Sequence, residues 1–356
     1  MSPESSRVEQ AHRMRVLIAC DLGPVVGIGH LMRCIALAEE LLSRGHSVEF
    51  LADAGEVPLA RTHLSSRGLP WRPPTKRLVD DLQGTTTPDV VVIDSYLRPE
   101  AEYDAVRALG PVVLAVIDGD PGGRVADLYL EQNFRAQEHR WALPEDAQHL
   151  AGLDYALMRA DVVRHRPATP VREREADPLK VFAFFGGTDA FEIAPVIVRA
   201  WAASGVPAAL TVVGATPSLA AAVREVELSE GQQLDVIGPT DRLAEHVVAS
   251  DAVMCAAGTT LWEVMCLGAA AGFVCVADNQ RPAYEQVVDA GLGVGLGHLD
   301  DLRAEPASAA VDVRRLLAQA ELRTDLRRRG WELVDGLGCA RVVDVMHALV
   351  IRRLAG

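Results

Sequence analysis

Short apolar runs of strand length alternate with helical stretches along almost the whole chain, in two successive series. The first series predicts strands over residues 15–20, 47–52, 90–94 and 112–118, and helices over 31–44 and 100–109. Strands that are apolar on both faces and separated by helices indicate a parallel sheet covered on each side. We therefore expect a doubly wound α/β domain over residues 14–162.

The second series begins at Lys180 and repeats the same alternation. It predicts strands over 181–187, 208–214, 234–238, 251–257, 271–277 and 292–296, and helices over 241–249, 261–267 and 281–290. Between the two series, residues 161–177 are rich in Arg, Pro and Glu, which is typical of a linker. We expect a second Rossmann-like domain over 178–356, with residues 312–354 as helices packing back on the body. Two such domains in series predict a ligand cleft between the carboxyl ends of their sheets.

Composition excludes several classes of function. A chain of 356 residues, 49% of them hydrophobic, can bury two sizeable cores. A formal net charge of -14 argues against nucleic acid and anionic membrane surfaces as partners. Six cysteines without a CxxC pair suit buried thiols rather than a zinc site or a disulfide framework. With no signal-peptide pattern and no apolar run of membrane length, we expect a cytoplasmic protein without stable membrane insertion.

The segment Gly27-Ile28-Gly29-His30 places a histidine where a glycine loop turns into a helix. The positive end of the helix dipole disfavours the imidazolium form by roughly 0.3–1 kcal/mol. A neutral imidazole can accept a proton, which makes His30 the candidate general base, and the Gly29 amide is a candidate ligand donor. The alternative is a histidine that caps the helix or fills a gap in the core.

Polar residues follow the next strands of the first series. Asp94 and Tyr96 end an apolar strand, so we expect them at the sheet rim near His30, where they can orient the imidazole and hold a sugar hydroxyl. The alternative for Asp94 and Ser95 is an Asx-type turn. Asp118 repeats the pattern one strand later, but the Asp118-Gly119 pair by itself signals a turn.

The second series contains another strand, glycine loop and helix start, at Gly258-Thr259-Thr260. No Lys or Arg occurs from Met254 to Ala271, so a phosphate here must be held by backbone N–H groups, threonine hydroxyls and the helix dipole. Glu263 then has the reach to bind ribose hydroxyls. The alternative is a capping box in which Thr260 and Glu263 only close the helix end.

Two further loops carry candidate ligand groups. Gly187 and Thr188 follow the first strand of the second series, and their amides suit a diphosphate; the alternative is an ordinary turn capped by Thr188 or Asp189. Asn279 and Gln280 close a later strand and can hydrogen-bond a sugar or a diphosphate, although Asn279 could equally be an N-cap.

Seven segments of the chain, in order, resemble the PseG/SpsG family over residues 15–297: 27–34, 94–96, 130–133, 152–159, 185–189, 257–263 and 279–280. Members of that family are similar to the lipid II glycosyltransferase MurG. The resemblance implies a GT-B fold, an α/β architecture of two Rossmann-like domains with a UDP-sugar in the cleft between them. Two features depart from the family: the chain is longer than its compact members, and residues 246–249 replace a Met that often precedes the UDP-loop strand.

The resemblance implies hydrolysis of a UDP-linked 2,4-diacetamido-2,4,6-trideoxy sugar at its anomeric carbon, a step toward pseudaminic acid, with no metal and no other cofactor. It makes His30 the base that activates water, and Tyr96 and Asn279 its active-site partners. The loops of the second domain would bind UDP. With Asp94, these residues form the expected catalytic set.

Two other functions remain open from the sequence. The first is a glycosyltransferase that moves a sugar from UDP or dTDP to the hydroxyl of an acceptor in a polysaccharide or natural-product pathway, using the same base. The second is a noncatalytic nucleotide-sugar sensor or a subunit that activates a partner transferase. A pure binder needs the nucleotide loops but no base, so His30, Tyr96 and Asn279 together favour an enzyme.

Overall fold

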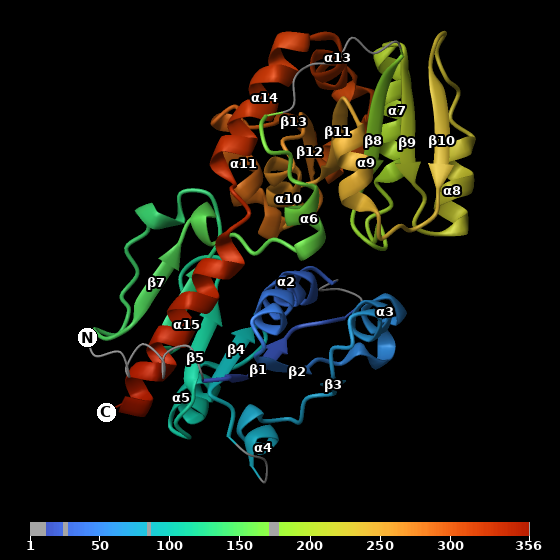
Figure 1. Ribbon diagram of the computed structural model, residues 1–356. Coiled ribbons are helices and arrows are strands. Elements are labelled where there is room, and N and C mark those ends of the chain that lie inside the picture. Colours follow the sequence, from blue (N-terminus) through green and yellow to red (C-terminus); the bar gives the residue numbers. More distant parts are fainter. Residues whose placement is uncertain (1–11, 24–27, 84–86, 171–177, 356) are drawn as a thin grey trace. The chain divides into compact units, whose positions relative to one another are not determined.

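The computed structural model describes residues 12–23, 28–83, 87–170 and 178–355. Their contacts divide the chain into two compact units (Figure 1). The first holds the residues up to Ala160 together with those from Gly336 onward, and the second holds Asp161–Asp335. Among the helices of these ranges, none combines the length and the hydropathy that crossing a bilayer requires.

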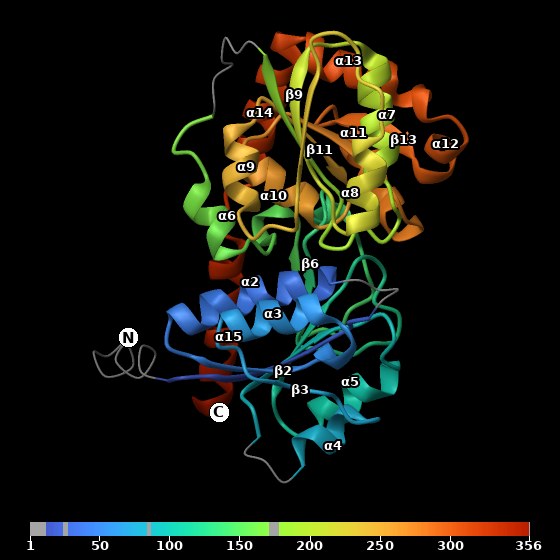
Figure 2. The ribbon, with the colours of Figure 1, turned by 90° about the vertical axis from the view of Figure 1, so that its right-hand side faces the viewer.

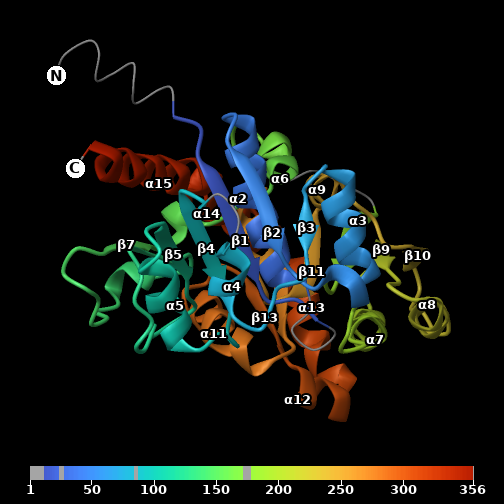
Figure 3. The ribbon, with the colours of Figure 1, turned by 90° about the horizontal axis from the view of Figure 1, so that it is seen from below.

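The first unit is built on a parallel sheet whose strand order is β3-β2-β1-β4-β5-β6-β7 (Figure 3). The strands are β1 (Arg15–Cys20), β2 (Ser47–Leu51), β3 (Trp71–Arg72), β4 (Val90–Asp94), β5 (Val112–Val116), β6 (Leu128–Glu131) and β7 (Gln148–Ala151). The chain winds outward from β1 in one direction and from β4 in the other. The carboxyl ends of β1 and β4 therefore flank a topological switch point, where ligands bind in open α/β sheets.

Helices cover both faces of this sheet (Figure 2). The helices α2 (Gly29–Ser43) and α3 (Pro58–Ser66) pack on one face, and α4 (Leu78–Leu82) and α5 (Glu100–Arg107) pack on the other. Successive residues of β1 alternate between the two cores: Val16 and Ile18 join the α2 side, whereas Leu17 and Ala19 join the α5 side. Apolar residues on both faces are what the sequence pattern required.

The last helix belongs to the first unit, which corrects the expected domain 178–356. In α15 (Gly338–Ala355), the buried side chains of Val342 and Met346 lie in the same core as Leu31 of α2. A Cβ at Gly338 would lie 2.2 Å from the carbonyl oxygen of Ala156, so only glycine allows the start of the helix to approach that segment. The sequence shows that one face of this helix is apolar, but it does not show which part of the molecule packs against that face.

The second unit repeats the topology with the strand order β10-β9-β8-β11-β12-β13. The strands are β8 (Leu179–Phe184), β9 (Ala208–Val213), β10 (Gln233–Ile237), β11 (Ala252–Ala256), β12 (Ala271–Cys275) and β13 (Val294–His298). Its helices are α7 (Ala194–Ser204), α8 (Pro217–Arg224), α9 (Leu243–Ala249), α10 (Thr260–Cys266), α11 (Arg281–Asp289), α12 (Leu299–Ala304), α13 (Ala310–Ala318) and α14 (Ala320–Leu333). Here the switch point lies between β8 and β11.

The structure confirms every strand predicted from the sequence to within a few residues. It adds three strands that were not predicted, β3, β6 and β7. The expected linker 161–177 contains most of a short helix, α6 (Ala160–His165), and its residues 171–177 lie outside the described ranges. The strand β6 is only four residues long and ends in Glu131, which is fully buried. Glu131 accepts hydrogen bonds from Trp141 Nε1 at 2.9 Å and from the rings of His139 and His149.

The place of α15 can be tested with Met346→Ala. Removing this fully buried side chain should cost about 2–5 kcal/mol of stability. Because α15 packs in the core of the first unit, hydrogen exchange should accelerate at the amides of α2 and stay unchanged at those of β8 and β9. The exposed Arg352→Ala on the same helix is the control. If hydrogen exchange accelerates only at the amides of β8 and β9, α15 packs in the core of the second unit instead.

Candidate functional site

The switch point of the first sheet brings the predicted base to its predicted partner. Gly29 and His30 begin α2, whose N-cap is Ile28, whereas Gly27 lies outside the described residues. His30 is 7% exposed, and its Nδ1 lies 2.5 Å from Oδ1 of Asp94 at the end of β4. His30 therefore does not cap its helix, and the Asp94 carboxylate is occupied by side chains rather than by an Asx turn.

The contact with Asp94 fixes the tautomer of His30. An ionised carboxylate can only accept hydrogen bonds, so Nδ1 must carry the hydrogen of the His30–Asp94 bond. The lone pair of the neutral ring then lies on Nε2. A ring held in this way can accept a proton at Nε2, and the buried carboxylate stabilises the cation that forms.

Arg33 keeps that carboxylate ionised in the core. Its Nε donates to Asp94 Oδ2 and its Nη2 donates to Asp94 Oδ1, both at 2.6 Å. Burial by itself raises the pKa of Asp94, but the charge and hydrogen bonds of Arg33, together with those of His30, outweigh it and hold this pKa well below its usual range. The fully buried Asp94 is therefore a carboxylate at neutral pH.

The same guanidinium reaches a second carboxylate, that of Asp118, which follows β5. Arg33 Nη1 lies 2.9 Å from Asp118 Oδ1, and Nη2 lies 3.0 Å from Oδ2. Burial raises the pKa of Asp118, but the Arg33 charge and hydrogen bonds lower it further, so it stays below its usual value. Asn133, after β6, donates from Nδ2 to Asp118 Oδ1 at 3.3 Å.

Tyr96 lies against His30, at the sheet rim where the sequence analysis expected it. Its ring meets the His30 ring edge to face, with centroids 4.6 Å apart, and its hydroxyl donates to Asp118 Oδ2. Burial and the Asp118 charge raise the pKa of Tyr96, so the phenol keeps its proton. Asp21 fixes the loop, because its carboxylate accepts from the Tyr96 amide and from the Ser95 hydroxyl, each at 2.7 Å. Ser95 in turn caps a local turn by accepting from Leu97 N.

In the second unit, the loops after β8 and β11 both lie at the switch point. Gly186 has a left-handed backbone (φ 81°), and Gly187 and Thr188 are exposed. Asp189 is buried, and its carboxylate accepts from Ile193 N and Ala194 N at the start of α7. Asp189 therefore holds the start of α7, whose N-cap is Ile193, while the two residues before Asp189 are exposed.

The loop after β11 does not form the capping box. The helix α10 begins at Thr260, and its N-cap, Thr259, makes no side-chain cap hydrogen bond. Gly258, Thr259, Thr260 and Glu263 are all half-buried. A Cβ at Gly258 would meet Gln280 Nε2 at 3.6 Å, so the loops after β11 and β12 adjoin. Asn279 is exposed in the short turn Asp278–Gln280 and is not the N-cap of α11, which is Gln280.

The predicted residues thus fall into two groups. His30, Asp94 and Tyr96 form one cluster in the first unit, whereas Asn279 and the nucleotide-loop residues lie in the second. The sequence analysis did not assign roles to Arg33, Asp21 and Asn133. Arg33 carried a usable signal, because it lies one helical turn after His30 on the same face of α2.

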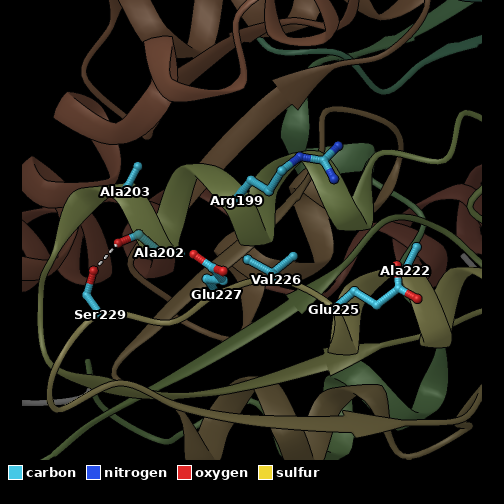
Figure 4. Close-up of a pocket in the computed structure, with 8 residues that line it drawn as sticks. All are labelled: Arg199, Ala202, Ala203, Ala222, Glu225, Val226, Glu227 and Ser229. Carbon is cyan, nitrogen blue, oxygen red and sulfur yellow. Dashed lines mark hydrogen bonds between the residues drawn. The ribbon is translucent and has the colours of Figure 1, made fainter.

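A hollow elsewhere on the second unit contains none of the predicted residues. It lies between α7 and the segment that follows α8 (Figure 4). Small and charged residues line it: Arg199, Ala202, Ala203, Ala222, Glu225, Val226, Glu227 and Ser229. Ser229 closes one side by donating from its hydroxyl to the Ala202 carbonyl at 2.9 Å.

No family model matches the chain. The chain is 24% identical over 359 residues to the spore coat polysaccharide biosynthesis protein SpsG of Bacillus subtilis (strain 168), an alignment that covers 94% of this chain and 98% of SpsG. The resemblance to the PseG/SpsG family is thereby confirmed along the chain.

Solved structures confirm the fold class. Acinetobacter baumannii MurG superposes with a TM-score of 0.66 at 17% identity, covering 95% of this chain and all of MurG. CalG4, the calicheamicin glycosyltransferase, gives 0.64 at 17% identity over 97% of this chain and 100% of its own. Phytolacca americana UGT2, complexed with UDP-2-fluoro-glucose and pterostilbene, gives 0.63 at 12% identity over 95% and 99%. The chain has the GT-B fold, with two Rossmann-like domains.

The Arg33–Asp94 pair predicts how stability depends on pH. Because the pKa of Asp94 is depressed by folding, its carboxylate stabilises the fold above the ordinary carboxyl pKa of about 4, and this contribution is lost as the pH falls below that value. Asp94→Asn should cost about 3 kcal/mol at pH 7, because Arg33 loses a buried partner, and less at pH 3.

Urea unfolding at both pH values, followed by hydrogen exchange at the amides of β4, measures the difference. The exposed Asp104→Asn on α5 is the control and should leave stability unchanged at either pH. An equal loss at pH 3 and pH 7 for Asp94→Asn would contradict the ionised state of Asp94.

Proposed function

We propose that this chain, which is similar to SpsG over its length and has the GT-B fold, is a glycosyltransferase that moves a sugar from a nucleotide to an acceptor hydroxyl. The observation that carries the proposal is the 2.5 Å bond from His30 Nδ1 to the buried Asp94 carboxylate, which leaves Nε2 as the proton acceptor. The solved structures support transfer over hydrolysis, since CalG4 is a glycosyltransferase and UGT2 was crystallised with a sugar nucleotide analogue and a second small molecule.

In the proposed reaction, His30 Nε2 removes the proton of the acceptor hydroxyl as its oxygen attacks the anomeric carbon of the donor. The bond between that carbon and the diphosphate oxygen breaks, and the nucleoside diphosphate leaves with the electron pair. Asp94 stabilises the imidazolium through Nδ1–H. The leaving group needs its negative charge stabilised more than it needs a proton donor.

We assign donor binding to the second unit. The backbone of Gly187 and Gly258 and the hydroxyls of Thr259 and Thr260 suit the diphosphate, because the chain has no Lys or Arg from Met254 to Ala271. Glu263, one turn into α10, suits the ribose hydroxyls. Thr188, Asn279 and Gln280 are assigned to the diphosphate and the sugar. The donor is proposed to be a UDP-sugar, with a dTDP-sugar as the alternative that the assay below includes.

Hydrolysis is the second candidate, because water can occupy the place of the acceptor hydroxyl and the PseG/SpsG resemblance implies that reaction. One assay separates the two. UDP-sugars and dTDP-sugars are incubated with the protein, alone and with a panel of hydroxylated acceptors, and both free sugar and glycosylated acceptor are quantified. Transfer predicts slow release of free sugar alone and fast product formation with an acceptor. Full-rate release of free sugar without any acceptor would replace transfer with hydrolysis.

His30→Ala tests the role of the base. Turnover should fall roughly 10²–10⁴-fold, because general base catalysis contributes on that order, while affinity for UDP stays unchanged. Turnover is measured in the assay above, and UDP affinity by calorimetry. If the variant also loses UDP binding, or if its turnover is undiminished, His30 is not the general base.

Gly258→Val tests the phosphate loop. A Cβ at this position makes only an ordinary contact with Gln280, so the fold should tolerate the side chain while the valine obstructs a phosphate that approaches the backbone. UDP affinity should fall at least tenfold by calorimetry. Gly238→Val is the matched control, because it follows β10 in the same sheet and a Cβ there meets nothing within 4 Å. An unchanged UDP titration would discard this loop as the phosphate site.

A further inference from the structure

The charges around His30 do not balance while its ring is neutral. Asp94 and Asp118 each carry a negative charge, because the pKa values of both carboxyls lie below their usual range. Arg33 supplies one positive charge to both of them. Two anions and one cation give this cluster of three side chains a net charge of -1. When His30 accepts a proton, the cluster becomes neutral.

We propose that Asp118 is a positioning residue that acts on the base through its charge, so that proton uptake by His30 neutralises a cluster that is otherwise negative. The inference rests on the proposed role of His30 as the general base. It assigns a function to Asp118, which has none in the reaction proposed above. Asp94 and Arg33 alone would form a neutral pair, and a protonated His30 would then leave a net positive charge in a desolvated site, which is costly. The second carboxylate removes that cost.

The carboxylate of Asp118 lies close to the His30 ring, because one guanidinium nitrogen of Arg33 contacts both of them. Arg33 Nη2 lies 3.2 Å from His30 Nδ1 and 3.0 Å from Asp118 Oδ2. The Asp118 side chain is 22% exposed, so solvent screens it only in part. Its remaining bonds hold it in place, since Tyr96 donates to Oδ2 and Asn133 donates to Oδ1.

The other titratable groups near His30 do not supply this charge. Besides Arg33, Asp94 and Asp118, they are Cys34 on α2, Cys20 and Asp21 at the end of β1, and Tyr96 after β4. Burial raises the pKa of Cys34 well above its usual value, and the pKa of Tyr96 is raised too, so both stay uncharged. Asp21 lies outside the ion-paired cluster, because its carboxylate accepts from the Tyr96 amide and the Ser95 hydroxyl, whereas Arg33 donates to Asp94 and Asp118.

The experiment measures proton uptake by the His30 ring directly, by NMR titration of protein labelled at histidine, with the His30 signal assigned by its loss in His30→Gln. Asp118→Asn keeps an acceptor for Arg33 and Tyr96 but removes the charge. The midpoint of the His30 titration should fall by about one pH unit. Asp118→Ser also removes the charge and should lower the midpoint similarly, whereas Asp118→Glu restores the charge and should return it toward the unsubstituted protein.

Asp120→Asn is the matched control, because Asp120 lies two residues further along the same loop, is exposed, and accepts from Gly122 N. Its His30 midpoint should not move. The acid limb of the pH profile of kcat/KM should move to lower pH in Asp118→Asn by the same interval as the NMR midpoint. If the plateau of kcat/KM falls but the acid limb of its pH profile does not move, Asp118 has a structural role only.

An unchanged or raised midpoint in Asp118→Asn and Asp118→Ser would overturn the charge role, whatever the activity of the protein. The NMR titration needs no substrate. Failure of the proposed function, seen as neither transfer nor hydrolysis by the unsubstituted protein, is therefore distinguishable from failure of this inference.

Discussion

The contact between the buried guanidinium of Arg33 and the carboxylate of Asp94 is the interaction on which the site depends. Asp94 is fully buried, and an isolated carboxylate in that position would take up a proton rather than stay charged. A protonated Asp94 would no longer require the hydrogen on Nδ1 of His30. Arg33 thus acts on the His30 ring indirectly, because it determines the charge of the group that orients the ring.

The doubly wound topology explains why residues so distant in sequence meet. In a parallel sheet every strand delivers its following loop to the same edge, and the edge is widest for a ligand where the winding reverses. His30 after β1, Asp94 at the end of β4 and Asp118 after β5 gather at that edge in the first unit. The second unit applies the same rule to the loops after β8, β11 and β12, which carry glycines and small polar side chains.

Several features of the site were predictable because they lie at the ends of strongly apolar strands. The strand Val90–Asp94 is recognisable from its valines, and a carboxylate that ends such a strand at the switch point is a sound candidate. The role of Asp118 was harder to predict, because Asp118-Gly119 also fits a simple turn. For Thr260 and Glu263 the local pattern favoured a capping box, yet α10 starts one residue earlier than that box requires. Sequence spacing defines which caps are possible, but the backbone angles at the helix start decide which one forms.

The sequence by itself determined the two doubly wound domains, the polar residues at the strand ends, and His30 at the start of a helix, because hydrophobic period and glycine placement are local properties of the chain. Tertiary structure alone decided that Arg33 neutralises Asp94, that Asp118 joins the same cluster, and that α15 completes the core of the first unit. These are pairings between residues far apart in the chain. The sequence shows that an apolar helix face or a charged side chain needs a partner. The folded topology decides which partner is close enough to contact it.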